Sequence, residues 1–159
     1  GMSKADQELL LEAAPMHDIG KVGIADNILL KPGRLDPQEF AVMKQHAEIG
    51  FQLLQGSSSQ TLQAGAAIAR GHHEKWDGSG YPAGLQGEDI PIFSRIVAVA
   101  DVFDALTSER PYKKAWSLED AVDYVKAGSG NHFDPKVVAA FLDCWEDVLA
   151  IRAKYQDVS

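Results

Sequence analysis

Six histidine and aspartate side chains, spread over four segments, are the residues of this chain best suited to chemistry. Neutral imidazole and carboxylate are the ligands that Fe, Mn, Co or Zn take where thiolate is absent, and the chain has a single cysteine. Each of the six lies in an otherwise apolar or structured stretch, so together they predict a built metal site. They are His17, Asp18, His46, His72, His73 and Asp101.

Asp101 is the hardest of the six to explain as a structural residue. It lies in the middle of the most hydrophobic segment, residues 92–107, and burying an ionised carboxylate without a partner costs several kcal/mol. An ion pair with Arg95 or Arg110 would explain a lone Asp101 as well as a metal would. Because the chain also offers four candidate histidine ligands, metal binding explains Asp101 better than an ion pair does.

The histidines also have structural alternatives. His46 lies on the apolar face of its predicted helix, where a single histidine is more often a hydrogen-bonded core residue than a ligand. His72 and His73 would diverge by about 100° within a helix. They can converge where the helix ends, which Gly71 and the following DGSG turn predict. The alternative is a polar helix end that complements the helix dipole. His132, in a turn with no evident partner, is interpreted as structural.

The adjacent pair His17-Asp18 points to two metal ions rather than one. A carboxylate beside a histidine can bridge two ions while the histidine binds one of them, and such a pair can activate water against phosphorus. Lys21, one turn further on, could neutralise a phosphoryl oxygen, although a solvated surface lysine explains it more simply. Asp18 and Lys21 are therefore the candidate catalytic residues.

Helices joined by glycine and proline turns are predicted to position these side chains. Four serine or aspartate residues have the sequence context of helix N-caps, and the helix after the last of them is predicted to run on to Leu149. These caps are Ser3, Asp36, Ser117 and Asp134.

Two further helices and one long loop complete the expected all-α fold. Residues 60–73 form an alanine-rich helix, and residues 92–107 are too long for a typical strand and apolar nearly all round, which favours a central buried helix. Residues 77–91 form a loop with four glycines and two prolines. An ordered loop of that length in a compact domain is more often functional than not.

Length and composition restrict the class of protein. A chain of 159 residues, 45% hydrophobic, is expected to form one domain over residues 1–159. A net charge of −8 without a basic block argues against binding DNA, RNA or an anionic membrane. No apolar run reaches membrane-spanning length. The single Cys144 fits a reducing compartment, so a cytoplasmic protein is expected.

Several long strings of the sequence closely resemble the HD-GYP family, a bacterial branch of the HD-domain metal-dependent phosphohydrolases. They are HDIGKVGIADNILLKPGRL, HHEKWDGSGYPAGLQGEDIP, RIVAVADVFDALTSERPYKKAWS and GNHFDP. The resemblance implies an HD-domain-like helical bundle with a GYP loop around two or more divalent metals. Iron or manganese is expected first, with Zn, Ni, Co or Mg as alternatives. The implied activity is hydrolysis of cyclic di-GMP to the linear dinucleotide or to GMP.

The resemblance also implies roles for individual residues. The six histidines and aspartates fall on metal-ligand positions, with Asp18 as the bridge, and Lys21 falls on a position that assists phosphate chemistry. Tyr81 lies in the loop that names the family, and Arg110 and Lys113 match its phosphate-contacting residues. A cyclic dinucleotide is thus the expected substrate. The further partners implied are a diguanylate cyclase domain, an upstream receiver or sensor domain, and a second copy in a homodimer.

The chain departs from the family ahead of the His-Asp pair. HD-family sites take a further histidine, or in some members a glutamate, from an upstream helix, and the sixteen residues before His17 contain no histidine. Neither Glu8 nor Glu12 matches that position. One of the two metal positions is therefore expected to be incomplete, because the chain is truncated at its N-terminus or because another subunit supplies the ligand. The incomplete position is His17, Asp18 and Asp101; the complete one is Asp18, His46, His72 and His73.

Three functions stay open at this point. The first is a metal-dependent cyclic di-GMP phosphodiesterase whose activity is impaired by the missing ligand. The second is a non-catalytic domain that binds the nucleotide or a partner protein, which the missing ligand favours modestly. The third is an HD-type phosphohydrolase acting on another nucleotide or phosphate ester, against which the GYP loop argues.

Overall fold

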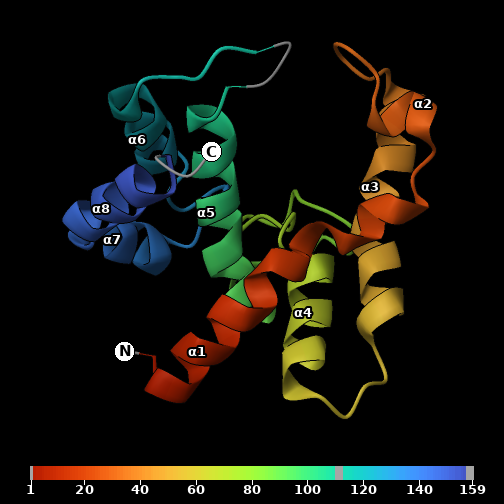
Figure 1. The fold of residues 1–159 in the computed structure, drawn as a ribbon, viewed down its shortest axis with the longest axis horizontal. Helices are drawn as coiled ribbons and strands as arrows, with labels where there is room; N and C mark the ends of the chain where they lie inside the picture. The colour runs from red at the N-terminus through yellow and green to blue at the C-terminus, as the bar shows by residue number, and fades with distance from the viewer. Residues whose placement is uncertain (1, 110–112, 157–159) are drawn as a thin grey trace.

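The computed structural model describes residues 2–109 and 113–156, which form helices joined by loops (Figure 1). No β-strand occurs in these two ranges, so the expected all-α fold is confirmed. None of their helices is long and apolar enough to cross a membrane. In chain order the elements are α1 (Lys4–Ala13), the 3-10 helix η1 (Ala14–Gly23), α2 (Asp26–Leu29), α3 (Pro37–Leu54), α4 (Gln60–Gly71), the 3-10 turn η2 (Gly87–Asp89), α5 (Ile92–Thr107), α6 (Leu118–Ala127), α7 (Pro135–Asp143) and α8 (Trp145–Gln156).

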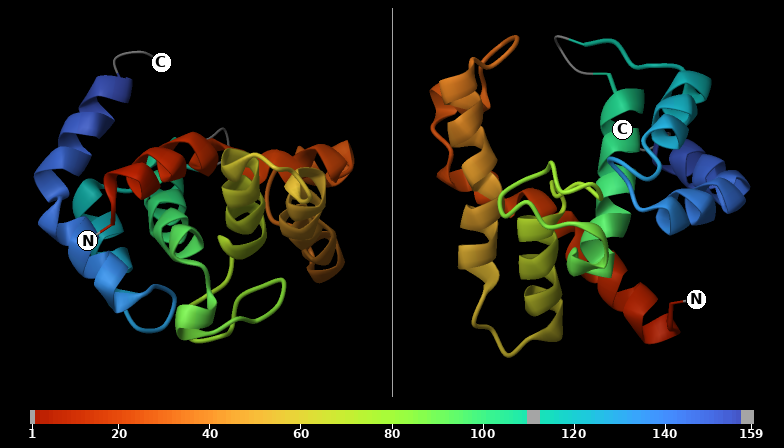
Figure 2. Two further views of the ribbon diagram at one scale, coloured as in Figure 1. Left: turned by 90° about the horizontal axis from the view of Figure 1, so that it is seen from below. Right: turned by 180° about the vertical axis from the view of Figure 1, so that it is seen from behind.

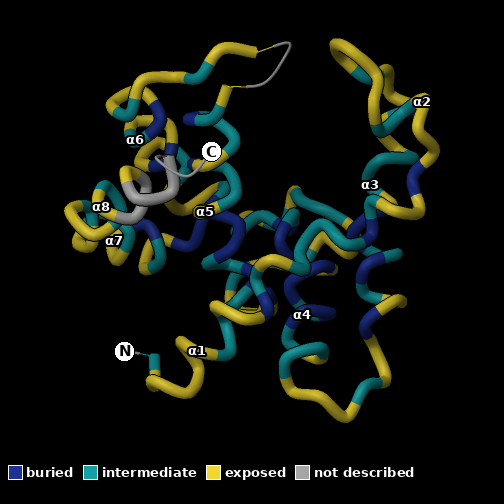
Figure 3. Tube along the Cα trace, viewed as in Figure 1, coloured by how far each residue is buried: buried dark blue, intermediate teal, exposed yellow. Residues whose placement is uncertain are grey.

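Helix α5 is the centre of the arrangement. It packs against α4 on one side and against α6 and α7 on the other, as both views of Figure 2 show. Helix α3 lies on the far side of α4, and the segment η1 crosses both helices and contacts each of them. Buried residues concentrate where η1, α3, α4 and α5 meet, whereas much of α1 and the α3–α4 loop is exposed (Figure 3). The helix predicted over residues 92–107 and its central place are confirmed, but it is only partly buried, since Ile92, Ala100 and Asp104 are exposed.

The predicted N-caps are observed at the starts of four helices. Ser3, Ser117 and Asp134 each accept a hydrogen bond from a backbone N–H in the first turn of the helix that follows. Asp36 forms a complete capping box, in which its carboxylate accepts from the Glu39 N–H at 2.7 Å and Glu39 accepts from the Asp36 N–H at 3.0 Å. These local signals set the helix starts.

The single helix predicted over residues 134–149 is wrong, because the chain turns at Cys144 between α7 and α8. Cys144 has φ −96° and ψ 18°, outside the helical range. Beyond the turn, the Trp145 ring packs edge-on against Phe103 and Phe141, with centroid distances of 5.8 and 5.9 Å. The apolar periodicity continues across Cys144, so local pattern alone does not reveal a break that accompanies this packing.

A glycine contact sets how closely η1 approaches α3. A Cβ atom at Gly20 would lie 1.8 Å from the carbonyl oxygen of His46 and 2.5 Å from the backbone nitrogen of Gly50. On the other side, a Cβ at Gly50 would lie 2.9 Å from the Cβ of Ala69 in α4. Backbone-to-backbone contact at this crossing therefore holds η1, α3 and α4 together at one point.

Candidate metal centre

The six predicted ligands converge from four elements. They come from η1, α3, the residues just after α4, and α5, and fall into two groups in which one ligand atom per residue lies within 4.8 Å of the others. The first group is Asp18, His46, His72 and His73, and the second is His17, Asp18 and Asp101. As predicted, the His72-His73 pair converges beyond the end of α4. Asp18 belongs to both groups.

His17 lies between two carboxylates. Its Nδ1 donates to the carbonyl of Ala14 at 2.8 Å, which turns Nε2 toward Asp101 Oδ1 at 3.2 Å and Asp18 Oδ2 at 3.1 Å. The hydrogen bonds to Asp101 and then to Asp18 raise the pKa of His17 to about 10. The two carboxylates thus favour a positive charge between them, the position that a cation would take.

His17 is also the partner that explains Asp101. Burial raises the pKa of the Asp101 carboxyl, but the hydrogen bond from His17 holds it below its usual value. Arg95 instead pairs with Asp134, with Nη1 to Oδ2 at 2.7 Å, so the alternative of an Arg95–Asp101 ion pair is wrong. Arg110, the other alternative, lies outside the described residues.

Two buried imidazole nitrogens face Asp18 without a hydrogen bond. His72 Nδ1 donates to the carbonyl of Ile68 at 3.0 Å, which turns Nε2 toward Asp18 Oδ1 at 3.6 Å. His46 Nδ1 lies 3.9 Å from the same oxygen. Both nitrogens are buried and lack a hydrogen-bond partner in the described part of the chain. Such unpaired groups are costly, and a ring anchored through its other nitrogen is typical of a metal-ligating histidine.

The charge states of these residues also suit a cation. Burial, followed by the nearby His72, lowers the pKa of His46 to about 4 and that of His73 to about 3, so both rings are neutral at pH 7, as metal ligation requires. Burial alone would raise the pKa of Asp18, yet the interactions of its carboxylate with His17 and then with His72, followed by the charges of His17 and Lys21, hold that pKa well below its usual range. The donor set fits divalent metal ions.

The Gly80-Tyr81-Pro82 loop contacts the centre through Tyr81. Its ring stacks on His73 with the centroids 4.8 Å apart and the planes 16° from parallel, and its N–H donates to the His73 carbonyl at 3.2 Å. Burial, then the charges of Asp101 and Asp18, raises the pKa of Tyr81 to about 12. Tyr81 therefore presents a neutral phenol group beside the candidate metal ligands.

Glu74 anchors this loop and was missed in the sequence analysis. Its side chain is buried, and its two oxygens accept hydrogen bonds from the N–H groups of Ala83 (3.0 Å), Gly84 (2.8 Å) and Leu85 (3.0 Å). An acidic residue directly after two candidate ligands and three positions before a glycine-rich loop was the available signal. The carboxylate fixes the segment that follows Tyr81.

Replacing Glu74 with alanine should lower the free energy of unfolding by about 3 kcal/mol, because it leaves three N–H groups without their charged acceptor. Urea denaturation followed by circular dichroism measures the change. The matched control is Glu88→Ala, an exposed glutamate of the same loop, which should change stability by less than about 0.5 kcal/mol. Equal effects of the two substitutions would show that other contacts hold the loop.

The predicted phosphate-contacting residues are placed only in part. Lys21 lies at the edge of the centre, with Nζ 3.3 Å from Asp18 Oδ2 and its side chain 40% exposed. The i, i+3 spacing in a 3-10 helix brings these two side chains onto one face. Lys113 Nζ donates to the carbonyl of Ala105 at 2.8 Å, at the exposed end of α5. Arg110 lies outside the described residues.

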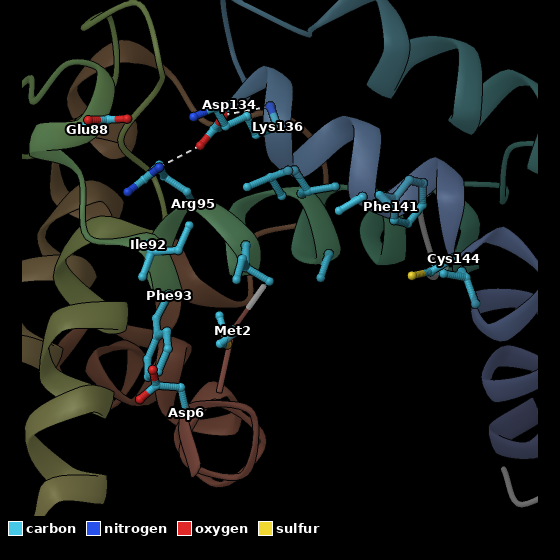
Figure 4. A pocket seen from close by; sticks show the side chains of 16 residues that line it. Met2, Asp6, Glu88, Ile92, Phe93, Arg95, Asp134, Lys136, Phe141 and Cys144 are labelled. Atoms are coloured by element: carbon cyan, nitrogen blue, oxygen red, sulfur yellow. Dashed lines mark hydrogen bonds and ion pairs between the residues drawn. The ribbon is translucent and has the colours of Figure 1, made fainter. Parts of the chain in front are cut away.

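Other features lie apart from the centre. His132 stacks on Phe133 at 4.1 Å and belongs to neither ligand group. A cavity of about 710 Å³ runs between the start of α1 and helices α5, α7 and α8 (Figure 4). Its walls are mainly apolar, with the Arg95–Asp134 ion pair at one end, and it includes none of the six ligands.

Comparison with known proteins agrees with this geometry. Residues 1–137 match the HD domain family. The chain is 48% identical over 157 residues to the 3'3'-cGAMP-specific phosphodiesterase 2 of Vibrio cholerae, covering 99% of this chain and 30% of that protein. It is 54% identical over 142 residues to the cyclic di-GMP phosphodiesterase response regulator RpfG of Xanthomonas campestris, covering 89% and 38%. The chain thus spans less than half the length of these relatives.

A solved structure shows the same fold. The HDG"Y"P protein of Bdellovibrio bacteriovorus superposes with a TM-score of 0.68 at 20% identity, over 91% of this chain and 45% of that one. The resemblance to HD-GYP proteins is therefore confirmed in both sequence and fold. With two aspartates and four histidines gathered at the centre of the matched region, the chain belongs to the HD domain family.

Proposed function

We propose that this chain is the catalytic domain of a metal-dependent cyclic-dinucleotide phosphodiesterase. The observation that carries the proposal is the position of Asp18, whose carboxylate is shared by two ligand groups and faces two buried, unpaired imidazole nitrogens. The names of the relatives support the substrate class, since they are phosphodiesterases for cyclic di-GMP and 3'3'-cGAMP. We propose cyclic di-GMP as the substrate and the linear dinucleotide or GMP as the product.

Two divalent ions are proposed as the cofactors. Asp18, His46, His72 and His73 would hold one, and His17, Asp18 and Asp101 the other. Bound there, such ions would activate water for attack and stabilise negative charge on the phosphoryl oxygens. Iron or manganese is proposed first, and Zn, Ni, Co or Mg are alternatives because nitrogen and oxygen ligands accept several metals.

The protein's own side chains would position the reacting groups. Backbone carbonyls fix the rings of His17 and His72, so that each presents Nε2 inward. The Lys21 ammonium group, at the exposed edge beside Asp18, would neutralise charge that grows on a phosphoryl oxygen. Lys113, which contacts the end of α5, and Arg110 are proposed to contact the substrate phosphates.

A non-catalytic nucleotide-binding domain is the second candidate, and one observation favours it. In the described residues, the group of His17, Asp18 and Asp101 offers three protein ligands, whereas the other group offers four. A metal held by three ligands and open to solvent would bind more weakly.

For the phosphodiesterase, we propose that a further ligand completes this position, from another part of the full protein or from a second subunit.

Metal content and turnover, measured together, test the proposal. Protein purified without a His-tag or chelator would be examined by elemental analysis and assayed with cyclic di-GMP. Two metals per chain with product formation would support the phosphodiesterase. About one metal per chain with tight cyclic di-GMP binding and no product would favour the binding domain. Turnover of another phosphate ester alone would point to the third function considered above.

Adding Mn²⁺ to metal-free protein should raise its melting temperature. Metal that binds only the folded state stabilises it, by about 2.7 kcal/mol at a concentration one hundred times its Kd. Differential scanning fluorimetry measures the shift, with His46→Ala as the variant that removes one buried ligand and His132→Ala as the control outside the centre. An equal shift in both variants would contradict the assignment of His46.

Neither the structure nor the comparisons show the other predicted partners. A diguanylate cyclase domain, an upstream receiver or sensor domain and a homodimer stay predictions. The relatives are more than twice as long as the matched region, so regulation of the whole protein is itself a matter of proposal.

A further inference from the structure

Lys44 of α3 is a half-buried cation without a carboxylate partner in the part of the chain that the structure describes. Its Nζ lies instead over two aromatic rings, 4.8 Å from the centroid of Phe40 and 5.1 Å from that of Tyr81. Its four-residue spacing from Phe40 puts both side chains on one helix face. In a chain of net charge −8, an unpaired ammonium group in such a place is available to a ligand.

The three residues form one group beside the metal centre, here named the Phe40–Lys44–Tyr81 cluster. The Phe40 and Tyr81 rings meet edge to face with centroids 6.3 Å apart. Tyr81 in turn stacks on His73, a member of the four-ligand group. Phe40 remains 43% exposed. Tyr81 therefore lies between the metal centre and Phe40. If a ligand placed its phosphate at the metal centre, the rest of that ligand could contact the cluster.

The chemistry of the cluster fits a purine base. Exposed aromatic rings stack with nucleobases of any kind, and a lysine ammonium group can only donate hydrogen bonds. Guanine presents two acceptors, O6 and N7, on one edge, whereas adenine places a donor, the N6 amino group, beside its N7. A lysine at the edge of a stacked base therefore favours guanine over adenine.

We propose that the Phe40–Lys44–Tyr81 cluster recognises a guanine base of the substrate, with Phe40 stacking on the base and Lys44 donating to its O6/N7 edge. The inference rests on the proposed function, because the base is taken to belong to a cyclic dinucleotide whose phosphodiester lies at the metal centre. Phe40 and Lys44 are then the residues that set base specificity.

Binding of GMP, AMP and inorganic phosphate to the metal-loaded protein tests this directly. Isothermal titration calorimetry gives the three dissociation constants for the unchanged chain, Lys44→Met, Lys44→Arg and Phe40→Leu. Lys126→Met, an exposed lysine of α6, and Leu53→Ala, an exposed residue of α3, are the matched controls. Metal content is measured for every variant.

GMP should bind the unchanged chain more tightly than AMP. Lys44→Met should raise the dissociation constant for GMP by about tenfold, which is the low end of the discrimination that such contacts give. The dissociation constant for AMP should change by less than about threefold. Lys44→Arg should restore the preference. Phe40→Leu should raise the dissociation constants of both nucleotides by about tenfold and change that of inorganic phosphate by less than about twofold.

Two results would overturn the inference. One is an unchanged chain that binds GMP and AMP equally. The other is a Lys44→Met variant that loses GMP, AMP and phosphate affinity alike, or loses metal, because Lys44 would then act only through phosphate or through the position of Tyr81. Absence of cyclic di-GMP turnover would sink the proposed function, but these binding measurements need no turnover, so the two failures are distinguishable.

Discussion

Replacing Asp18 with asparagine should lower metal-dependent turnover of cyclic di-GMP by at least about a thousandfold. Asp18 is the one residue that both ligand groups share, so the amide removes a negative charge from both metal positions at once. It also removes the carboxylate that faces His46 and His72. Steady-state kcat/KM and metal content per chain measure the effect, and metal content should fall below one.

Asp104→Asn is the matched control for this substitution. Asp104 lies one turn beyond Asp101 on α5 and is exposed, and among the described residues its carboxylate accepts a hydrogen bond from Ser108. Its replacement should change kcat/KM by less than about twofold. If Asp18→Asn kept two metals and near-normal turnover, the shared-carboxylate arrangement would not be the reacting site.

Replacing Gly20 with alanine should lower the free energy of unfolding by about 3 kcal/mol or more. The new methyl group would meet the His46 carbonyl and the Gly50 nitrogen, which are backbone atoms of a packed helix and have no rotamer to change. Either η1 moves off α3 or the protein unfolds. Because η1 carries His17 and Asp18, metal content should fall even in molecules that stay folded.

Gly23→Ala provides the comparison within the same 3-10 segment. A Cβ there would approach only the side chain of Ile49, at 3.0 Å, and that side chain can adjust. Urea denaturation should show a loss of no more than about 1 kcal/mol. Similar losses at Gly20 and Gly23 would mean that the close backbone crossing is not what holds the segment in place.

The features predictable from the sequence are those that short stretches encode. The Asp36 capping box needs only residues three apart, and it appears as expected. The apolar run of α5 is long enough to exclude a typical strand, and it forms the central helix. The six ligand candidates were found by type, because buried histidines and a buried carboxylate in apolar segments need compensation that their neighbours in sequence do not supply.

The features that sequence reasoning missed depend on contacts between distant segments. The partner of Asp101 is His17, more than eighty positions earlier, and no local pattern distinguishes it from Arg95. The break at Cys144 accompanies the packing of Trp145 on α5. The role of Glu74 depends on three backbone N–H groups that face it only after the loop has folded back. The proposed role of Lys44 depends on its contact with the Tyr81 ring, which belongs to the loop after α4 and not to α3.

Three consecutive residues, His72, His73 and Glu74, join the metal centre to the loop. The two histidines face Asp18 or stack on Tyr81, while Glu74 holds the backbone nine to eleven residues further on. With His72 and His73 as the proposed ligands, metal affinity and loop position would be thermodynamically coupled through one tripeptide. Any macromolecule that pulled this loop outward would weaken metal binding, and the metal would reciprocally weaken that macromolecule's affinity by the same factor.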